Sequence, residues 1–500
     1  MPALSFFDWV NCPRRSARNS AIPNWDVRRP GKLRVGAFMN MTTSRAMDLS
    51  PVARAAQRLF TANEILFVIA LVFGIVLGVD LATRETQGYV RTAANDIVRI
   101  FLLGGLFVYA LLFVLMDYAR RYWIGIALAA ALLITALAVA GTGAVIELSQ
   151  QSGGYVENGL IAALLLGPLV FWFALQLIAS WRLLSENVGP LGRSLPDVDQ
   201  RIRELAENLA AGGHAARPRY PWLGPTVLGI GLAAIGVTIL SFLAVIGIGE
   251  RSSDPTVQQL AGDTAFLGFL TLPVSAFLLQ RGRKLSRPDA ARLLEADARA
   301  PIMLLRSFQD DEKSVKRRSA VARLLFWVFG GIRLEEAIAG ELSRFGPFVA
   351  IGEPGERLPD LGAARSYFSD GEWQAAVLDW IGRARTIVVI AGKTRSVRWE
   401  LQQVIASGKL DHLVLLLPPD TPAGRAARWQ LIAEALSASP WRAALEGIDT
   451  SHVIALCQKP GTSTEIITFS SAAPRQVDYE IAIRLAVYAM HTRPAARSPH

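Results

Sequence analysis

Residues 386–419, TIVVIAGKTRSVRWELQQVIASGKLDHLVLLLPP, consist of two short apolar runs with an amphipathic segment between them. Short apolar runs bounded by turn residues are typical of buried strands, and apolar residues at helical spacing are typical of a helix that covers them. The stretch therefore predicts a strand, a helix and a second, parallel strand. One acid, Glu400, lies near the start of the expected helix, where it is either a surface charge or the working residue of a site.

The same alternation continues through residues 301–492 and predicts an α/β domain. Strands are expected at 302–308, 348–351, 386–391, 412–418, 452–457 and 465–470, with helices at 334–345, 372–384, 397–407, 424–437 and 477–490. This order favours a doubly wound, flavodoxin-like parallel sheet of five strands, and it leaves one additional strand to be placed. Ligands bind such sheets outside the carboxyl ends of the strands, near the point where the strand order reverses. The loops after residues 308, 351 and 391 are therefore the candidate site.

The first 280 residues have a different character. Apolar residues make up 52% of the chain and charged residues 19%, and several apolar runs in this part reach about 20 residues, the length that a helix needs to cross a bilayer. Six spans are expected, at 65–82, 97–116, 123–146, 159–179, 225–248 and 265–280. The distribution of arginines between the loops places both termini in the cytoplasm. These features predict an α-helical membrane bundle in contact with lipids, in a multi-pass protein of a bacterial inner membrane.

The remaining segments complete the predicted organisation. It comprises a disordered, Arg-rich cytoplasmic tail at 1–58, the transmembrane domain at 59–283, a basic linker at 284–300, the α/β domain at 301–492 and a short tail at 493–500. The net charge of +10 is explained by arginines that flank the expected spans, so no nucleic-acid partner is expected. The two cysteines, Cys12 and Cys457, cannot form a disulfide framework or a Cys-based metal site. No metal site is predicted.

Two loops of the expected sheet resemble those of the TIR (Toll/interleukin-1 receptor) domain. The first strand ends in Ser307 and Phe308, which are followed by Asp310. The family's first strand ends in a similar pair, Ser-Phe or Ser-Tyr, and then an acid. The next loop contains EPG, 353–355, which is similar to the acid and the Pro-Gly pair that the family often has there.

The third loop carries the most informative part of this resemblance. SVRWEL, 396–401, is similar to the family's helix opening, Trp-Cys-x-x-Glu-Leu, and places Glu400 at the family's Glu. Ser396 stands where the family usually has Trp. A long insertion at 311–333 precedes the first helix, and its segment LLFWVF, 324–329, either lies on a membrane surface or packs on the sheet.

Catalytic members of this family cleave the nicotinamide glycosidic bond of NAD+ with that Glu. The resemblance therefore implies Glu400 as a catalytic carboxylate and NAD+ as a substrate, with no cofactor. The leaving nicotinamide is already a cationic pyridinium, so one ionised carboxylate can stabilise the oxocarbenium-like ribosyl centre without a general acid. The positive end of a helix favours that ionised form. The expected ligand-binding residues are Ser307, Phe308, Asp310, Gly352, Glu353, Gly355 and Thr394.

Other interpretations of these residues stay open. Glu400 is also explained as an acid at the start of a solvated helix. The leading hypothesis is a membrane-anchored signalling or defence protein that cleaves NAD+ or binds a nucleotide-like ligand. The alternative is a non-enzymatic scaffold that self-associates or recruits partners, with Trp399 as a candidate contact. A transporter with a regulatory cytoplasmic domain is third, because the centres of the expected spans lack charged residues.

Overall fold

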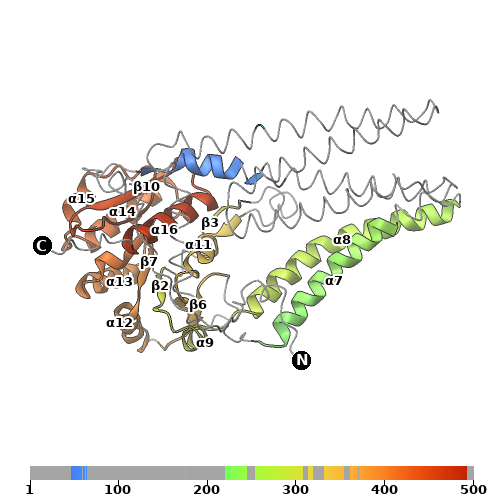
Figure 1. The fold of residues 1–500 in the computed structure, drawn as a ribbon, viewed down its shortest axis with the longest axis horizontal. Coiled ribbons are helices and arrows are strands. Elements are labelled where there is room, and N and C mark those ends of the chain that lie inside the picture. Colours follow the sequence, from blue (N-terminus) through green and yellow to red (C-terminus); the bar gives the residue numbers. More distant parts are fainter. Residues whose placement is uncertain are drawn as a thin grey trace, which may run out of the picture.

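A computed structural model describes residues 47–58, 60–61, 64, 175, 220–244, 254–307, 313–318, 331–353, 361–369 and 371–491. Its largest part is an eight-stranded mixed sheet with helices around it (Figure 1). The strand order is β1-β10-β9-β8-β7-β2-β5-β6. The strands are β1 Met47–Asp48, β2 Ile302–Leu305, β5 Phe348–Ile351, β6 Ala364–Ser366, β7 Thr386–Ile390, β8 Leu413–Leu416, β9 Val453–Gln458 and β10 Ile466–Ser470.

The middle of the sheet is parallel and doubly wound. β2 pairs in parallel with β5 on one side and with β7 on the other, and β6 and β8 extend these two sides. The chain therefore runs outward from β2 through β5 and β6, returns across β2, and continues through β7 and β8. The strand order reverses between β2 and β7, which makes their carboxyl ends the expected ligand position in such a sheet.

The far side of the sheet corrects the prediction of an all-parallel domain. β9 is antiparallel to both β8 and β10. The connection between β9 and β10 is short, with the Lys459 N–H donating to the Glu465 carbonyl at 2.9 Å and Gly461 at a φ of 81°. Such a tight connection can join only antiparallel neighbours. The hydrophobic pattern of a strand reports its burial and not its direction, so the sequence did not predict this edge.

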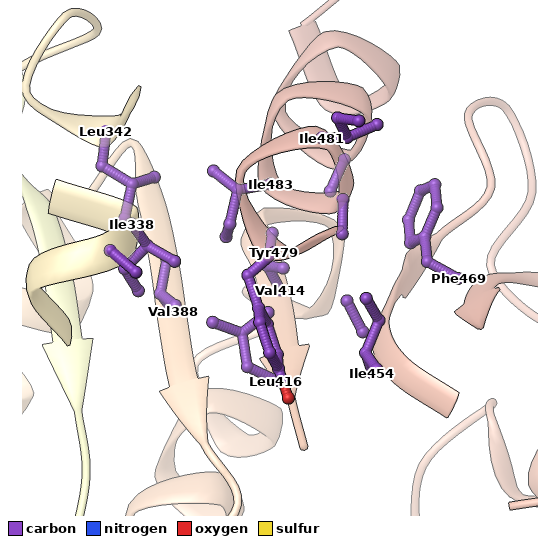
Figure 2. Packing of buried hydrophobic residues seen from close by; sticks show 14 of the residues in the cluster. Ile338, Leu342, Val388, Val414, Leu416, Ile454, Phe469, Tyr479, Ile481 and Ile483 are labelled. Carbon is purple, nitrogen blue, oxygen red and sulfur yellow. The ribbon is translucent and has the colours of Figure 1, made fainter. Parts of the chain in front are cut away.

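Helices cover both faces of the sheet because side chains alternate along each strand. Ile302 and Leu304 of β2 lie in one buried cluster, and Met303 and Leu305 lie in the other. The first cluster contains side chains of α11 (Leu334–Leu342) and α16 (Gln476–His491), and Figure 2 shows part of it. The second face is covered by α12 Trp373–Arg383, α13 Arg395–Ala406 and α14 Pro422–Ala435, with α9 Ala290–Ala296, the short α15 Arg442–Glu446 and the 3₁₀ turn Leu410–His412 at its margins.

The predicted disordered tail of residues 1–58 contains an ordered segment at its end. Met47 and Asp48 form β1, which pairs in parallel with Phe469 and Ser470 of β10. Residues 50–58 are helical, and Leu49 and Val52 are buried in the first cluster. An edge strand gains its hydrogen bonds from a partner that is distant in sequence, which explains why local composition did not predict it.

Two long helices precede the α/β domain. α7 (Leu223–Ala244) and α8 (Pro255–Leu285) lie side by side (Figure 1). Glycines allow the close approach, since a Cβ at Gly282 would overlap the backbone of Leu228. A separate two-stranded antiparallel sheet, β3 Ser314–Lys316 and β4 Gly331–Arg333, follows β2 in the chain.

These helices also correct the predicted membrane class. The first four predicted spans fall outside the described residues apart from residue 175, and the fifth and sixth correspond to α7 and α8. Among the helices that the structure describes, none combines the length and the apolar character needed to cross a bilayer. This finding contradicts the six-helix transmembrane domain and the inner-membrane localisation. The predicted span 265–280 is one part of a longer helix that carries Asp263, Arg281 and Arg283, and apolar helix faces also arise where helices pack on each other.

Candidate functional site

The candidate site is built at the carboxyl ends of β2 and β7, where the strand order reverses. Arg306 and Ser307 directly follow β2. Lys393 and Thr394 lie in the turn between β7 and α13. α13 then runs back across the sheet and presents Glu400 on its inner face.

Glu400 is buried, with 8% of its surface exposed. It shares the inner face of α13 with Val397, Leu401 and Val404, which belong to the second hydrophobic cluster. Burial raises the pKa of the Glu400 carboxyl to about 8, although the positive charge of Arg306 acts in the opposite direction. The interpretation of Glu400 as a solvated helix start is therefore wrong, and so is the expectation of a carboxylate ionised by the helix dipole. Glu400 lies beyond the first turn of α13, where the dipole effect has faded.

The two carboxyl oxygens of Glu400 are not equally satisfied. Within the part of the chain that the structure describes, Oε2 is buried and has no hydrogen-bond partner. A buried polar oxygen without a partner costs about 1–3 kcal/mol of stability. Buried ionisable groups with strongly shifted pKa values, such as Glu400, are concentrated at functional sites.

Arg306 belongs to a buried charge network next to Glu400. Its Nε lies 3.1 Å from Oε2 of Glu335, and Nη2 of Arg365 lies 3.3 Å from the same oxygen. The other oxygen of Glu335 accepts a hydrogen bond from the Ala363 N–H at 2.7 Å. Two guanidinium groups thus share one carboxylate, and the charge of one of them, Arg306, acts on Glu400.

Ser307 is a further predicted residue that lies in this region. It is 2% exposed, and among the described residues its hydroxyl has no hydrogen-bond partner. Ser307 and Glu400 therefore both end in a buried polar atom that has no hydrogen-bond partner among the described residues. Phe308 and Asp310, predicted together with Ser307, lie outside the described residues.

The residues predicted after β5 contribute less to the site. Gly352 is buried and donates its N–H to the Ser366 carbonyl at 2.9 Å. A Cβ at this position would overlap the ring of Tyr367, so the glycine is explained by the packing of that ring. Glu353 is exposed, and Gly355 lies outside the described residues.

Thr394 is the N-cap residue of α13. Its side chain makes no capping hydrogen bond to the helix, and its hydroxyl lies 2.9 Å from that of Ser396. The first N–H groups of α13 are therefore not capped by Thr394. Thr394 and Lys393 lie on the side of the site that faces solvent, since Lys393 is exposed.

Sequence reasoning missed Asp420, which organises the loops around the site. Its Oδ2 lies 2.8 Å from Nε of Arg428 and 3.2 Å from Nζ of Lys393, and its Oδ1 lies 3.3 Å from Nζ of Lys313. Burial alone would raise the pKa of the Asp420 carboxyl, but hydrogen bonds from Arg428, the Thr421 N–H and the two lysines hold it well below its usual value. Asp420 and Arg428 lie eight residues apart, whereas Lys393 and Lys313 come from two other segments, so no local motif contains all four.

Trp399 packs within the domain. Its ring meets that of Trp373 edge to face, with the ring centroids 5.0 Å apart. It is half-buried against the start of α12. In the described ranges, no group of three or more His, Cys, Asp or Glu side chains is arranged to hold a metal ion.

Comparison of the chain with family models, with curated proteins and with solved structures found no match. The resemblance to TIR domains therefore rests on the sequence motifs alone.

Proposed function

We propose that the α/β domain binds NAD+ at the carboxyl ends of β2 and β7 and hydrolyses its nicotinamide glycosidic bond with Glu400. The observation that supports this best is the buried Glu400 carboxyl, whose Oε2 has no hydrogen-bond partner within the described residues. It lies where doubly wound sheets bind their ligands. The sequence motif around Glu400 gives the same residue the same role.

A single carboxylate is sufficient for this reaction. The bond between C1′ of the ribose and the nicotinamide nitrogen breaks, and its electron pair neutralises the pyridinium. A water oxygen then bonds to C1′, and the proton that this water loses goes to solvent. Positive charge on the ribosyl centre rises in the transition state, and a carboxylate in a water-excluded position stabilises that charge more strongly than one in water.

The raised pKa of Glu400 fits a cationic substrate. In the free protein the carboxyl is largely protonated at neutral pH, because its pKa is raised to about 8. A pyridinium placed beside it favours the ionised form, since a nearby opposite charge lowers a carboxyl pKa. Binding of NAD+ would thus create the carboxylate that the reaction needs. A neutral ligand of similar shape would lack this effect.

The direct test compares NAD+ hydrolysis by the full-length chain and by Glu400→Gln. Gln keeps the size of the side chain and cannot ionise, so we expect turnover to fall by at least about a hundredfold. Glu434→Gln is the matched control, because Glu434 is an exposed α14 residue paired with Arg398 at 3.0 Å. It should leave turnover within about twofold. Turnover by Glu400→Gln equal to that of the wild type would refute the proposal.

A further inference from the structure

The end of α8 is attached to the α/β domain at a point close to the candidate site. α8 ends in a basic stretch that includes Arg283 and Lys284, and Arg287 follows its C-cap. α11 begins with two acids, Glu335 and Glu336. Burial raises the pKa of Glu336, and Arg317, Arg287, Arg283 and Lys284 oppose that shift. Opposite charges therefore meet between the two helices.

Arg287 makes a specific bond in this region. Its Nη1 donates a hydrogen bond to the carbonyl of Gly362, which lies just before β6. The turn that precedes Arg287 is itself closely packed, because a Cβ at Gly224 of α7 would overlap the backbone of Ser286. The position of Arg287 is thus fixed by the α7–α8 pair.

The Gly362–Ala363 segment is held from its other side by Glu335. The Ala363 N–H donates to Oε1 of Glu335 at 2.7 Å. No side chain fits at Gly362, since a Cβ there would overlap the same carboxylate. A movement of this segment would therefore move the Glu335 carboxylate.

Glu335 in turn holds Arg306, the side chain whose charge acts on Glu400. The Arg306–Glu335 ion pair is 3.1 Å long, and both side chains are buried. A continuous series of contacts thus leads from Arg287 through Gly362–Ala363 and Glu335 to Arg306 and Glu400. Each step is a direct bond or a direct electrostatic interaction.

We propose that Glu335 is a positioning residue of the candidate site, and that Arg287 couples the α7–α8 pair to it. The catalytic consequence rests on the proposed function, whereas the mechanical coupling does not. When Arg287 holds the Gly362 carbonyl, Glu335 keeps Arg306 in its ion pair, from which the charge of Arg306 acts on Glu400. When that bond is lost, the Gly362–Ala363 segment can shift, and the Arg306–Glu335 ion pair is disturbed. The arrangement of α7 and α8 then controls the site from outside it.

Four variants of the full-length chain separate this coupling from a general loss of stability. Arg287→Ala removes the bond to Gly362. Arg287→Lys retains one hydrogen-bond donor and should keep part of the coupling that Arg287→Ala loses. Arg292→Ala is the matched control on the same linker, because Arg292 forms a more exposed ion pair with Asp289 at 3.5 Å. Glu335→Gln tests the next step and keeps an acceptor for the Ala363 N–H.

Hydrogen exchange measured by mass spectrometry tests the coupling without any assay of activity. We expect Arg287→Ala and Glu335→Gln to speed exchange in peptides covering 302–307 and 395–401 by at least about fivefold, because local opening becomes easier there. Arg292→Ala should leave both peptides unchanged. If Arg287→Ala changes exchange only in the linker itself, the coupling is wrong.

The kinetics of NAD+ hydrolysis test the catalytic consequence. Loss of a charged hydrogen bond in the series should lower kcat roughly tenfold in Arg287→Ala, with KM within about twofold and partial recovery in Arg287→Lys. A purely structural defect would instead lower the fraction of active enzyme, and Arg287→Lys would not restore it. If neither the wild type nor any variant cleaves NAD+, but hydrogen exchange at 395–401 still responds to Arg287→Ala, the coupling stands and the NAD+ proposal fails. If the wild type cleaves NAD+ and neither exchange nor kcat responds, the coupling fails alone.

Discussion

Glu400 and Asp420 both lie beyond the parallel strands and have side chains with little exposed surface, and their surroundings are opposite. Asp420 is bonded to Arg428, Lys393 and Lys313, and its pKa is lowered although burial opposes this. Burial raises the pKa of Glu400, and the charge of Arg306, which is paired with Glu335, only partly opposes this. The comparison teaches that burial does not identify a working acid. The partners of Asp420 explain its burial by structure alone, whereas the unpartnered Oε2 of Glu400 among the described residues is the basis of the proposed ligand site.

The largest expected effect concerns Asp420. Asp420→Asn leaves Arg428, which is 1% exposed, buried without its carboxylate. We expect the free energy of unfolding to fall by about 3–5 kcal/mol, as is usual when one member of a buried ion pair is removed. Unfolding in guanidinium chloride, followed by tryptophan fluorescence, measures this loss of stability. A loss below about 1 kcal/mol would show that Asp420 is not the structural carboxylate of this comparison.

Glu400→Gln should have the opposite effect on stability. The pKa of Glu400 is raised from 4.5 to about 8, so between these values the folded protein keeps a proton that the unfolded chain releases. Stability contributed by Glu400 therefore falls as the pH rises from 4.5 to about 8. Gln removes this penalty, and we expect a gain on the order of 3 kcal/mol at pH 7 that vanishes below the unfolded pKa.

The measurement is the same unfolding experiment, repeated for both proteins from acid to neutral pH. A difference between wild type and Glu400→Gln that does not change with pH would show that Glu400 has an ordinary pKa. Glu434→Gln again serves as the control, since Glu434 is exposed.

The pH profile of NAD+ hydrolysis should show the same ionisation. For a reaction that needs the Glu400 carboxylate, kcat/KM of the wild type should rise about tenfold per pH unit below the pKa and level off near pH 8. The profile of kcat should level off at lower pH, because the bound pyridinium lowers the pKa of Glu400. Coincident profiles would mean that the substrate does not act on this ionisation.

The smallest effect is expected for Lys393→Met. Lys393 pairs with Asp420 at 3.2 Å, but its side chain is 44% exposed, and Arg428 remains as the buried partner. Exposed ion pairs contribute about 0–1 kcal/mol, so the free energy of unfolding should change by less than about 1 kcal/mol. A larger loss would show that the stability contributed by Asp420 depends on all three of its cationic partners.

Local pattern predicted most strands and helices around the site. Thr386–Ile390, Arg395–Ala406 and Leu413–Leu416 lie where residues 386–419 placed a strand, a helix and a strand. Each segment is long enough to show its own period, and each packs on its neighbours in the chain. The placement of Glu400 near the start of that helix follows from the same pattern.

The features that sequence missed depend on contacts between distant segments. The strand Met47–Asp48 pairs with Phe469 and Ser470, and the direction of β9 is set by pairing and not by composition. Lys313 and Asp420 are 107 residues apart in the chain. The ionisation of Glu400 was also predicted wrongly, because burial on the inner face of α13 raises its pKa and the helix dipole has faded beyond the first turn. The apolar runs before residue 280 predicted spans that the described helices do not support.

Proton release on ligand binding tests the central claim most directly. The ligand is a carbocyclic NAD+ analogue that keeps the pyridinium charge and cannot be hydrolysed, and calorimetry at pH 7 in buffers of different ionisation enthalpy counts the protons. The wild type should release about one proton per bound ligand, because the cation ionises Glu400, and Glu400→Gln should bind the analogue without that release. Binding to the wild type with no proton released, or with the same release in Glu400→Gln, would contradict the role of Glu400 proposed here.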